Sequence, residues 1–285
     1  MTTLAKTRSV VALIRPEITL AIGTCVLVGE ITALRNLPPI REALLGFLTG
    51  FFISSSAMVM NDYFDVEVDK VNAPHRPLPK GTISFNEVLL LATATSIAGL
   101  VAAGLFGSLN FIIAALSWML GLLYNWKFKE KGLLGNMFVS TSVAIQFVYG
   151  GAVVGDPLNE IVLSCSVIAF LADLGVEVAG DIVDVRGDEL RDAATVVRIW
   201  GKSVAIRFSS LLLLSVIPIS FVPYLMGWLG QVYVAMITIP DFILAYSVLE
   251  LFRSRTAAEV KKILRQLLLC IPLAFIAFVV GALYY

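Results

Sequence analysis

The chain has 285 residues, of which 58% are hydrophobic and 15% charged, and its formal net charge is zero. Soluble domains carry about a quarter charged residues, so this composition is typical of a membrane protein and excludes an ordinary soluble domain. A balanced charge gives no electrostatic basis for nucleic-acid binding, and three cysteines set far apart in apolar runs indicate neither a disulfide framework nor a zinc site.

Apolar stretches of about 20 residues, long enough to span a hydrocarbon core about 30 Å thick, recur along the chain. The first is too long for a signal peptide and has no small-residue cleavage site, so we expect it to be retained. The fold class is therefore all-α and integral to the membrane, with residues 1–285 forming a single polytopic domain. We predict nine transmembrane helices, at 10–34, 40–68, 85–106, 108–125, 135–154, 159–184, 203–226, 230–251 and 264–284.

Lysine and arginine gather in every second connection between these spans, and the remaining connections hold only Arg35 and Arg41. Cytoplasmic loops carry the excess of such cations. The N-terminus and the polar loops at 70–84, 126–134 and 185–202 are therefore predicted to be cytoplasmic. An odd number of spans then places the C-terminus outside, in a multi-pass protein of the cell membrane.

The first of two acidic stretches covers residues 61–69 and follows directly on the second span. Asn61, Asp65 and Asp69 are four residues apart and share one stripe of a helix, with Asp62 at its edge. Like charges this close repel one another unless a cation lies between them. We predict that Asn61, Asp65 and Asp69 are catalytic metal ligands and that Asp62 contacts these ligands without binding the metal itself.

The second acidic stretch, at the end of the sixth span, has the same pattern. Its five carboxylates also follow a single helical stripe, and they are Asp173, Glu177, Asp181, Asp184 and Asp188. We predict Asp181, Asp184 and Asp188 as metal ligands, the last two also catalytic, and Glu177 as a supporting residue. The alternative is a solvated acidic helix end paired with nearby lysine and arginine, but the recurrence of the stripe favours a metal site.

Oxygen ligands without histidine or cysteine select hard cations, so Mg²⁺ is the expected cofactor. Mg²⁺ held by one or two carboxylates keeps coordination positions for phosphate oxygens. Two such clusters around a diphosphate would stabilise the negative charge that develops on it as it leaves.

Cations that could bind the same diphosphate lie in the loops beside both clusters. Arg76 and Lys80 belong to a loop with three prolines, and we predict that both contact phosphate oxygens, although positive-inside topology alone would also place them there. After the fourth span, Lys127 is predicted as a further phosphate contact. Tyr124 is predicted to contact substrate on the cavity wall, and an interfacial aromatic belt explains it equally well.

These motifs resemble the UbiA superfamily of intramembrane prenyltransferases over nearly the whole chain. The matching features are Asn-Asp-x-x-Asp-x-x-x-Asp at 61–69, Asp-x-x-Asp-x-x-x-Asp at 181–188, Arg-Pro-Leu-Pro at 76–79, Tyr-x-x-Lys at 124–127 and the nine spans. The resemblance implies that the acidic motifs bind Mg²⁺ and a polyprenyl diphosphate around a central cavity open to the cytoplasm. It also implies that C1–O cleavage gives an allylic cation, which an acceptor captures while the tail lies in a groove open to lipid.

The motifs also bear on which molecule accepts the prenyl group. The run at 61–72 with Arg-Pro-Leu-Pro is most similar to the archaeal branch that adds a geranylgeranyl group to geranylgeranylglyceryl phosphate in ether-lipid synthesis. Many family members carry Arg-Glu-x-x-Lys-Asp before the second motif, whereas Val176 and Gly180 stand at the two cationic positions here. Lys127, Lys129 or Arg186 would have to replace the lysine. The alternative acceptor is an aromatic ring, such as a 4-hydroxybenzoate in quinone synthesis.

A cation transporter is the alternative from another functional class. Transporters place carboxylates near the bilayer midplane, at discontinuous helices. Most carboxylates here lie at the ends of predicted spans beside a basic loop, and only Asp173 lies deeper. The pattern therefore favours the enzyme, and release of diphosphate from geranylgeranyl diphosphate would discriminate between the two.

Overall fold

Apolar helices follow one another along almost the entire chain. The computed structural model describes residues 3–190 and 192–285, and within these residues nine segments are long and apolar enough to cross a bilayer. The predicted all-α membrane fold and the number of spans are thus confirmed. In chain order the elements are α1 (Thr3–Ile14), α2 (Pro16–Leu34), α3 (Ile40–Phe64), α4 (Val66–Asn72), α5 (Phe85–Gly104), α6 (Ser108–Leu123), the π-helical η1 (Tyr124–Phe128), the 3-10 helix η2 (Lys129–Lys131), α7 (Leu133–Val153), α8 (Glu160–Leu190), α9 (Val196–Trp200), α10 (Lys202–Ser220), α11 (Val222–Leu225), α12 (Gln231–Arg253), α13 (Ala257–Leu267) and α14 (Cys270–Leu283).

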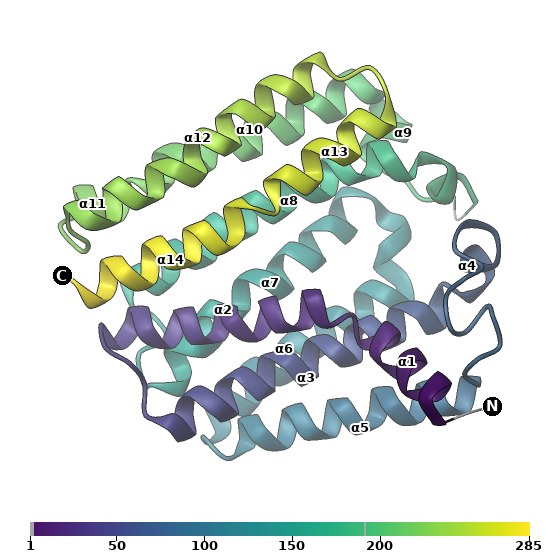
Figure 1. Ribbon diagram of the computed structural model, residues 1–285, viewed down its shortest axis with the longest axis horizontal. Helices are drawn as coiled ribbons and strands as arrows, with labels where there is room; N and C mark the ends of the chain where they lie inside the picture. Colours follow the sequence, from purple (N-terminus) through teal and green to yellow (C-terminus); the bar gives the residue numbers. More distant parts are fainter. Residues whose placement is uncertain (1–2, 191) are drawn as a thin grey trace.

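The long helices run side by side, with the two halves of the chain forming the two sides of one bundle (Figure 1). Helices α2, α3, α5 and α6 make one side, α8, α10, α12 and α14 make the other, and α7 packs against both α2 and α8. The termini lie at opposite ends, as an odd number of spans requires. The short helices α1, α4 and α9 gather at the end that holds the N-terminus (Figure 1).

The outer faces of the spans are apolar, as expected for contact with lipid. Leu90, Leu211 and Phe242 on three different helices are among the most exposed side chains. Since lipid is as apolar as leucine, close packing rather than hydrophobic burial holds such helices together. Gly150 of α7 provides one close approach, because a Cβ there would lie 2.1 Å from the carbonyl oxygen of Val26 on α2.

Several predicted spans are interrupted, and two of the interruptions lie in the spans at 10–34 and 40–68. The span predicted at 10–34 is broken at Arg15, whose backbone is left-handed (φ 53°, ψ 70°) between α1 and α2. Pro16 disfavours the right-handed helical conformation of the residue before it, which explains the break. The span predicted at 40–68 is interrupted at Asp65 (φ −87°, ψ 0°), where α3 ends and α4 begins.

A small apolar cluster anchors the loop at 70–84 beside the end of α3. Its buried members come from α1, α3, the loop and α5, and are Leu13, Val59, Leu78, Ile83, Val88 and Ala92. Helix α5 then begins with a capping box between Ser84 and Glu87, and Lys6 of α1 forms a 2.6 Å ion pair with Glu87. These contacts hold α1 and the basic loop against the first acidic stretch.

Candidate active site

The first acidic stretch keeps its helical stripe across the junction of α3 and α4. The backbone N–H of Asp65 donates to the carbonyl of Asn61 (3.0 Å), and that of Asp69 donates to the carbonyl of Asp65 (2.8 Å). The three carboxylates are buried, with residue exposures of 1% for Asp62, 6% for Asp65 and 4% for Asp69. This helix end is therefore buried and not solvated.

Each of these carboxylates pairs with a cation from a different part of the chain. Arg15 pairs with Asp62, Arg76 with Asp69 at 2.7 Å, and Lys129 with Asp65. Buried charges are stable only when they are paired, so the three cations allow three carboxylates to lie within about two helical turns of one another. We call Asn61, Asp62, Asp65 and Asp69 the first cluster.

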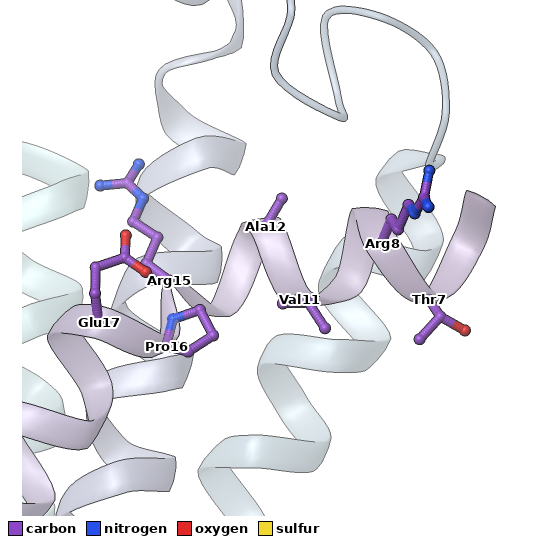
Figure 2. A pocket seen from close by; sticks show the side chains of 7 residues that line it. All are labelled: Thr7, Arg8, Val11, Ala12, Arg15, Pro16 and Glu17. Atoms are coloured by element: carbon purple, nitrogen blue, oxygen red, sulfur yellow. The ribbon is translucent and has the colours of Figure 1, made fainter. Parts of the chain in front are cut away.

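Arg15 reaches the first cluster because the chain breaks at this residue. Its guanidinium also donates to the Asn61 side-chain oxygen, at 3.1 Å. Left-handed backbone at a residue other than glycine costs about 1–3 kcal/mol, and residues strained in this way cluster at functional sites. Figure 2 shows the Arg15 side chain standing at the α1–α2 junction beside Glu17, with Arg8 further along α1. These residues line a pocket of about 470 Å³ that opens next to the cluster, together with Thr7, Val11, Ala12 and Pro16.

Arg76 brings the predicted basic loop into the cluster. It lies 3.5 Å from Asp62 as well as 2.7 Å from Asp69. Burial lowers the pKa of the Arg76 guanidinium, but the hydrogen bond with Asp69 and the charge of Asp62 outweigh this effect, so the pKa lies above its usual value. Arg76 is thus permanently cationic. Lys80, the other predicted phosphate contact of this loop, is exposed.

The end of α6 forms a π-helical turn, and this turn decides which lysine enters the site. In a π turn the backbone bond joins residues five apart, and here the N–H of Lys129 bonds to the carbonyl of Tyr124. Lys129 lies 5.8 Å from the centre of the Tyr124 ring and pairs with Asp65. Lys127, predicted as the phosphate contact, is exposed, and among the described residues no ion pair joins it to the first cluster.

The second acidic stretch lies on the last turns of the continuous helix α8. Helix α7 contacts it from one side, since Ser140 donates to Asp173 (2.8 Å) and Asn136 donates to Asp181 (3.2 Å). Asp184 is exposed, and the negative charges of Asp184 and Asp188 both act on Asp181. We call Asp181, Asp184 and Asp188 the second cluster.

Lys129 and Gly132 connect the segment after α6 to α8 and to the residues that follow it. The charge of Lys129 acts on Glu177 of α8 while its ammonium pairs with Asp65. Gly132 has a positive φ of 54°, and a Cβ at this residue would lie 1.9 Å from the Ala194 carbonyl oxygen, in the segment that follows α8. The Ala194 N–H in turn donates to the Glu130 carbonyl at 2.9 Å. This close backbone contact fixes the segment carrying Lys129 against the end of α8.

Several of these residues had only weak signals in the sequence. An Arg-Pro pair inside an apolar stretch marks an ionisable residue at membrane depth, and this rule could have identified Arg15. Asn125, Lys129 and Asn136 carry no comparable mark, because the first two depend on the π turn and Asn136 depends on the packing of α7 on α8. The side chain of Arg186, considered above as a substitute cation, lies outside the described residues.

The donor set of the two clusters suits a hard cation. Among the described residues, no three histidine, cysteine, aspartate or glutamate side chains are close enough together to hold a metal ion. Arg15, Arg76 and Lys129 instead occupy carboxylate oxygens of the first cluster. The side chains that the two clusters offer are carboxylates and one amide, and such oxygen ligands fit Mg²⁺.

Comparison with known proteins gives a consistent result. Residues 22–279 match the model of the UbiA prenyltransferase family. The digeranylgeranylglyceryl phosphate synthase of Thermococcus sibiricus is 33% identical over 276 residues, covering 96% of each chain. A solved structure described as giving insights into digeranylgeranylglyceryl phosphate synthase in membranes has a TM-score of 0.81 at 26% identity, covering 98% of this chain and 99% of that one. A UbiA homologue from Archaeoglobus fulgidus bound to GPP and Mg²⁺ has a TM-score of 0.69 at 16% identity, covering 95% and 99% of the chains.

The fold and the site thus define a multi-pass membrane protein with two acidic clusters beside basic side chains. The chain belongs to the UbiA prenyltransferase family. It is therefore an enzyme that transfers prenyl groups, and the cation-transporter alternative is excluded.

Proposed function

We propose that this enzyme transfers a geranylgeranyl group from geranylgeranyl diphosphate to geranylgeranylglyceryl phosphate, with Mg²⁺ as cofactor, in archaeal ether-lipid synthesis. The observation that carries the proposal is the first cluster, in which buried carboxylates of α3 and α4 lie among Arg15, Arg76 and Lys129. The acceptor is inferred from the relatives, since chains about 30% identical over nearly the full length are named digeranylgeranylglyceryl phosphate synthase.

The two clusters would hold Mg²⁺ through Asn61, Asp65 and Asp69 on one side and Asp181, Asp184 and Asp188 on the other. Bound Mg²⁺ supplies positive charge to diphosphate oxygens and so helps diphosphate to leave. The homologue from Archaeoglobus fulgidus, which binds GPP and Mg²⁺, supports this assignment. Two further carboxylates would hold the metal ligands in place without binding Mg²⁺ themselves. They are Asp62, which pairs with Arg15, and Glu177, which lies near Lys129.

The basic side chains of this chain would also bind the diphosphate. Arg76 and Lys129, which pair with carboxylates here, would turn to the phosphate oxygens and keep the leaving group in place, and Lys80 and Lys127 would approach it from the exposed side. The bond between C1 of the prenyl group and its oxygen breaks, and both electrons stay with the diphosphate. The acceptor hydroxyl oxygen would then bond to C1, and its proton would pass to the released diphosphate, so the products are an ether and protonated diphosphate. Tyr124, beside Lys129, would line the path of the prenyl group.

The proposal also includes an orientation. The first cluster lies at the end of the bundle that holds the N-terminus and α4, and the basic connections predict that this end faces the cytoplasm. Water-soluble diphosphate would therefore be released into the cytoplasm, while the prenyl tails remain in the lipid of the cell membrane.

An acceptor comparison tests the proposal. Purified protein is supplied with geranylgeranyl diphosphate and Mg²⁺, and receives either geranylgeranylglyceryl phosphate or 4-hydroxybenzoate in parallel. Mass spectrometry should find a prenylated product only with the glycerol lipid. A product with 4-hydroxybenzoate alone would reject the acceptor and favour an aromatic prenyltransferase of quinone synthesis.

A further inference from the structure

Asn125 lies in the π turn η1 and contacts the first cluster from the side opposite Arg15. Its residue exposure is 7%. Its amide nitrogen donates to the backbone carbonyls of Ala57 on α3 and Gly121 on α6, both at 3.0 Å. Carbonyl oxygens only accept hydrogen bonds, so the nitrogen of the Asn125 amide must face them. The side-chain oxygen of Asn125 therefore faces the other way, toward Asn61.

The orientation of Asn125 determines that of Asn61. The Asn61 amide nitrogen donates to the Asn125 side-chain oxygen at 2.9 Å. At the other end, the Asn61 side-chain oxygen accepts a hydrogen bond from Arg15 at 3.1 Å. A guanidinium only donates, so the hydrogen bonds run in one direction from Arg15 through Asn61 and Asn125 to the two carbonyls. Rotating the Asn61 amide by half a turn would place donor against donor at Arg15 and acceptor against acceptor at Asn125.

From this chain of hydrogen bonds we infer that Asn125 is a positioning residue, which makes Asn61 present its oxygen, rather than its NH₂ group, to the cation bound by the first cluster. The inference rests on the proposed function, because it concerns Asn61 as a metal ligand. An amide has one oxygen able to bind a cation, and its nitrogen would repel one. Partners that orient a metal ligand typically change metal affinity about 10–100-fold when they are removed.

The test measures Mg²⁺ binding rather than turnover. Isothermal titration calorimetry of the purified full chain with Mg²⁺, in the presence of inorganic diphosphate, gives the affinity, and thermal unfolding reports the fold. We expect Asn125→Leu, which has a similar volume but no polar atoms, to weaken Mg²⁺ binding about 10–100-fold. Asn110→Leu is the matched control, since Asn110 is also a buried asparagine of the α6 segment, near the opposite end of that helix. Its Mg²⁺ affinity should equal that of the wild type.

A double variant separates orientation from general support of the fold. A carboxylate presents an oxygen whichever way it is turned, so Asn61→Asp removes the need for an orienting partner. The double variant N61D/N125L should therefore bind Mg²⁺ more tightly than N125L alone, and N125L should cause no loss in the N61D background.

The results discriminate between failure of the inference and failure of the proposed function. Equal Mg²⁺ affinity of N125L and wild type would overturn the inference and leave the proposed function intact. Weakened binding that N61D does not restore would also overturn it, because Asn125 would then act only through the fold. If the wild type itself bound no Mg²⁺ with diphosphate present, the proposed function would fail together with the inference.

Discussion

Replacing Lys129 by methionine tests whether the π turn selects the lysine that binds diphosphate. Methionine keeps much of the length and removes the charge, and the side chain of Lys129 is 17% exposed in its pair with Asp65. A hydrogen bond to a charged group contributes about 1.5–3 kcal/mol. If Lys129 turns to the diphosphate in the transition state, its loss should lower kcat/KM for geranylgeranyl diphosphate about 10- to 150-fold.

Lys127→Met is the comparison, because Lys127 belongs to the same short segment and is exposed. Exposed ion pairs contribute about 0–1 kcal/mol, so this variant should lose at most about fivefold in kcat/KM. The assay is steady-state diphosphate release at varied donor concentration, with thermal unfolding of both variants as a check on the fold. A larger loss for K127M than for K129M would refute the assignment of Lys129.

Three further outcomes follow from the site. Chelation with EDTA should abolish prenyl transfer and added Mg²⁺ should restore it, since oxygen ligands hold Mg²⁺ reversibly, so activity that survives exhaustive chelation would contradict the metal assignment. Arg15→Met should lower the free energy of unfolding by about 1.5–3 kcal/mol, because Asp62 is 1% exposed, loses its shorter ion pair and keeps only the 3.5 Å pair with Arg76, whereas exposed Arg8→Met should change thermal unfolding little. Gly132→Ala should lower both the unfolding temperature and activity, because the added Cβ would collide with the Ala194 carbonyl. Gly81→Ala is the control: Gly81 has a φ of 72° but no atom within 4 Å of its Cβ position, so this variant should show only the backbone strain of about 1–2 kcal/mol. Equal effects of the two substitutions would contradict the proposed role of the Gly132 contact.

Periodic features of the chain were predictable from the sequence. Apolar runs gave the nine spans, because span length follows from bilayer thickness. The spacing of Asp181, Asp184 and Asp188 on one stripe follows from the helical period, and α8 is indeed continuous through all three.

Local interruptions of the helices were not predictable in the same way. A proline can bend a helix or end it, and only the structure shows that Pro16 leaves Arg15 in a left-handed conformation that directs its side chain to Asp62. The π turn could not be predicted for a related reason. A helical turn closed by a bond between residues five apart, instead of four, has no signature in the amino-acid composition. In this turn Lys129 pairs with Asp65, whereas Lys127, predicted as a phosphate contact, is exposed.

The central claim is that the two acidic clusters ionise a prenyl diphosphate for transfer to a lipid hydroxyl. The most direct measurement is diphosphate release from geranylgeranyl diphosphate in the presence of geranylgeranylglyceryl phosphate and Mg²⁺, for wild type, Asp65→Asn, Asp184→Asn and Asp241→Asn. Asp241 is the control, because this carboxylate is also buried but accepts a 2.6 Å hydrogen bond from Ser220 in the other side of the bundle. We predict release by wild type and D241N and almost none by D65N and D184N. Release by D65N and D184N at the rate of the wild type would contradict the account.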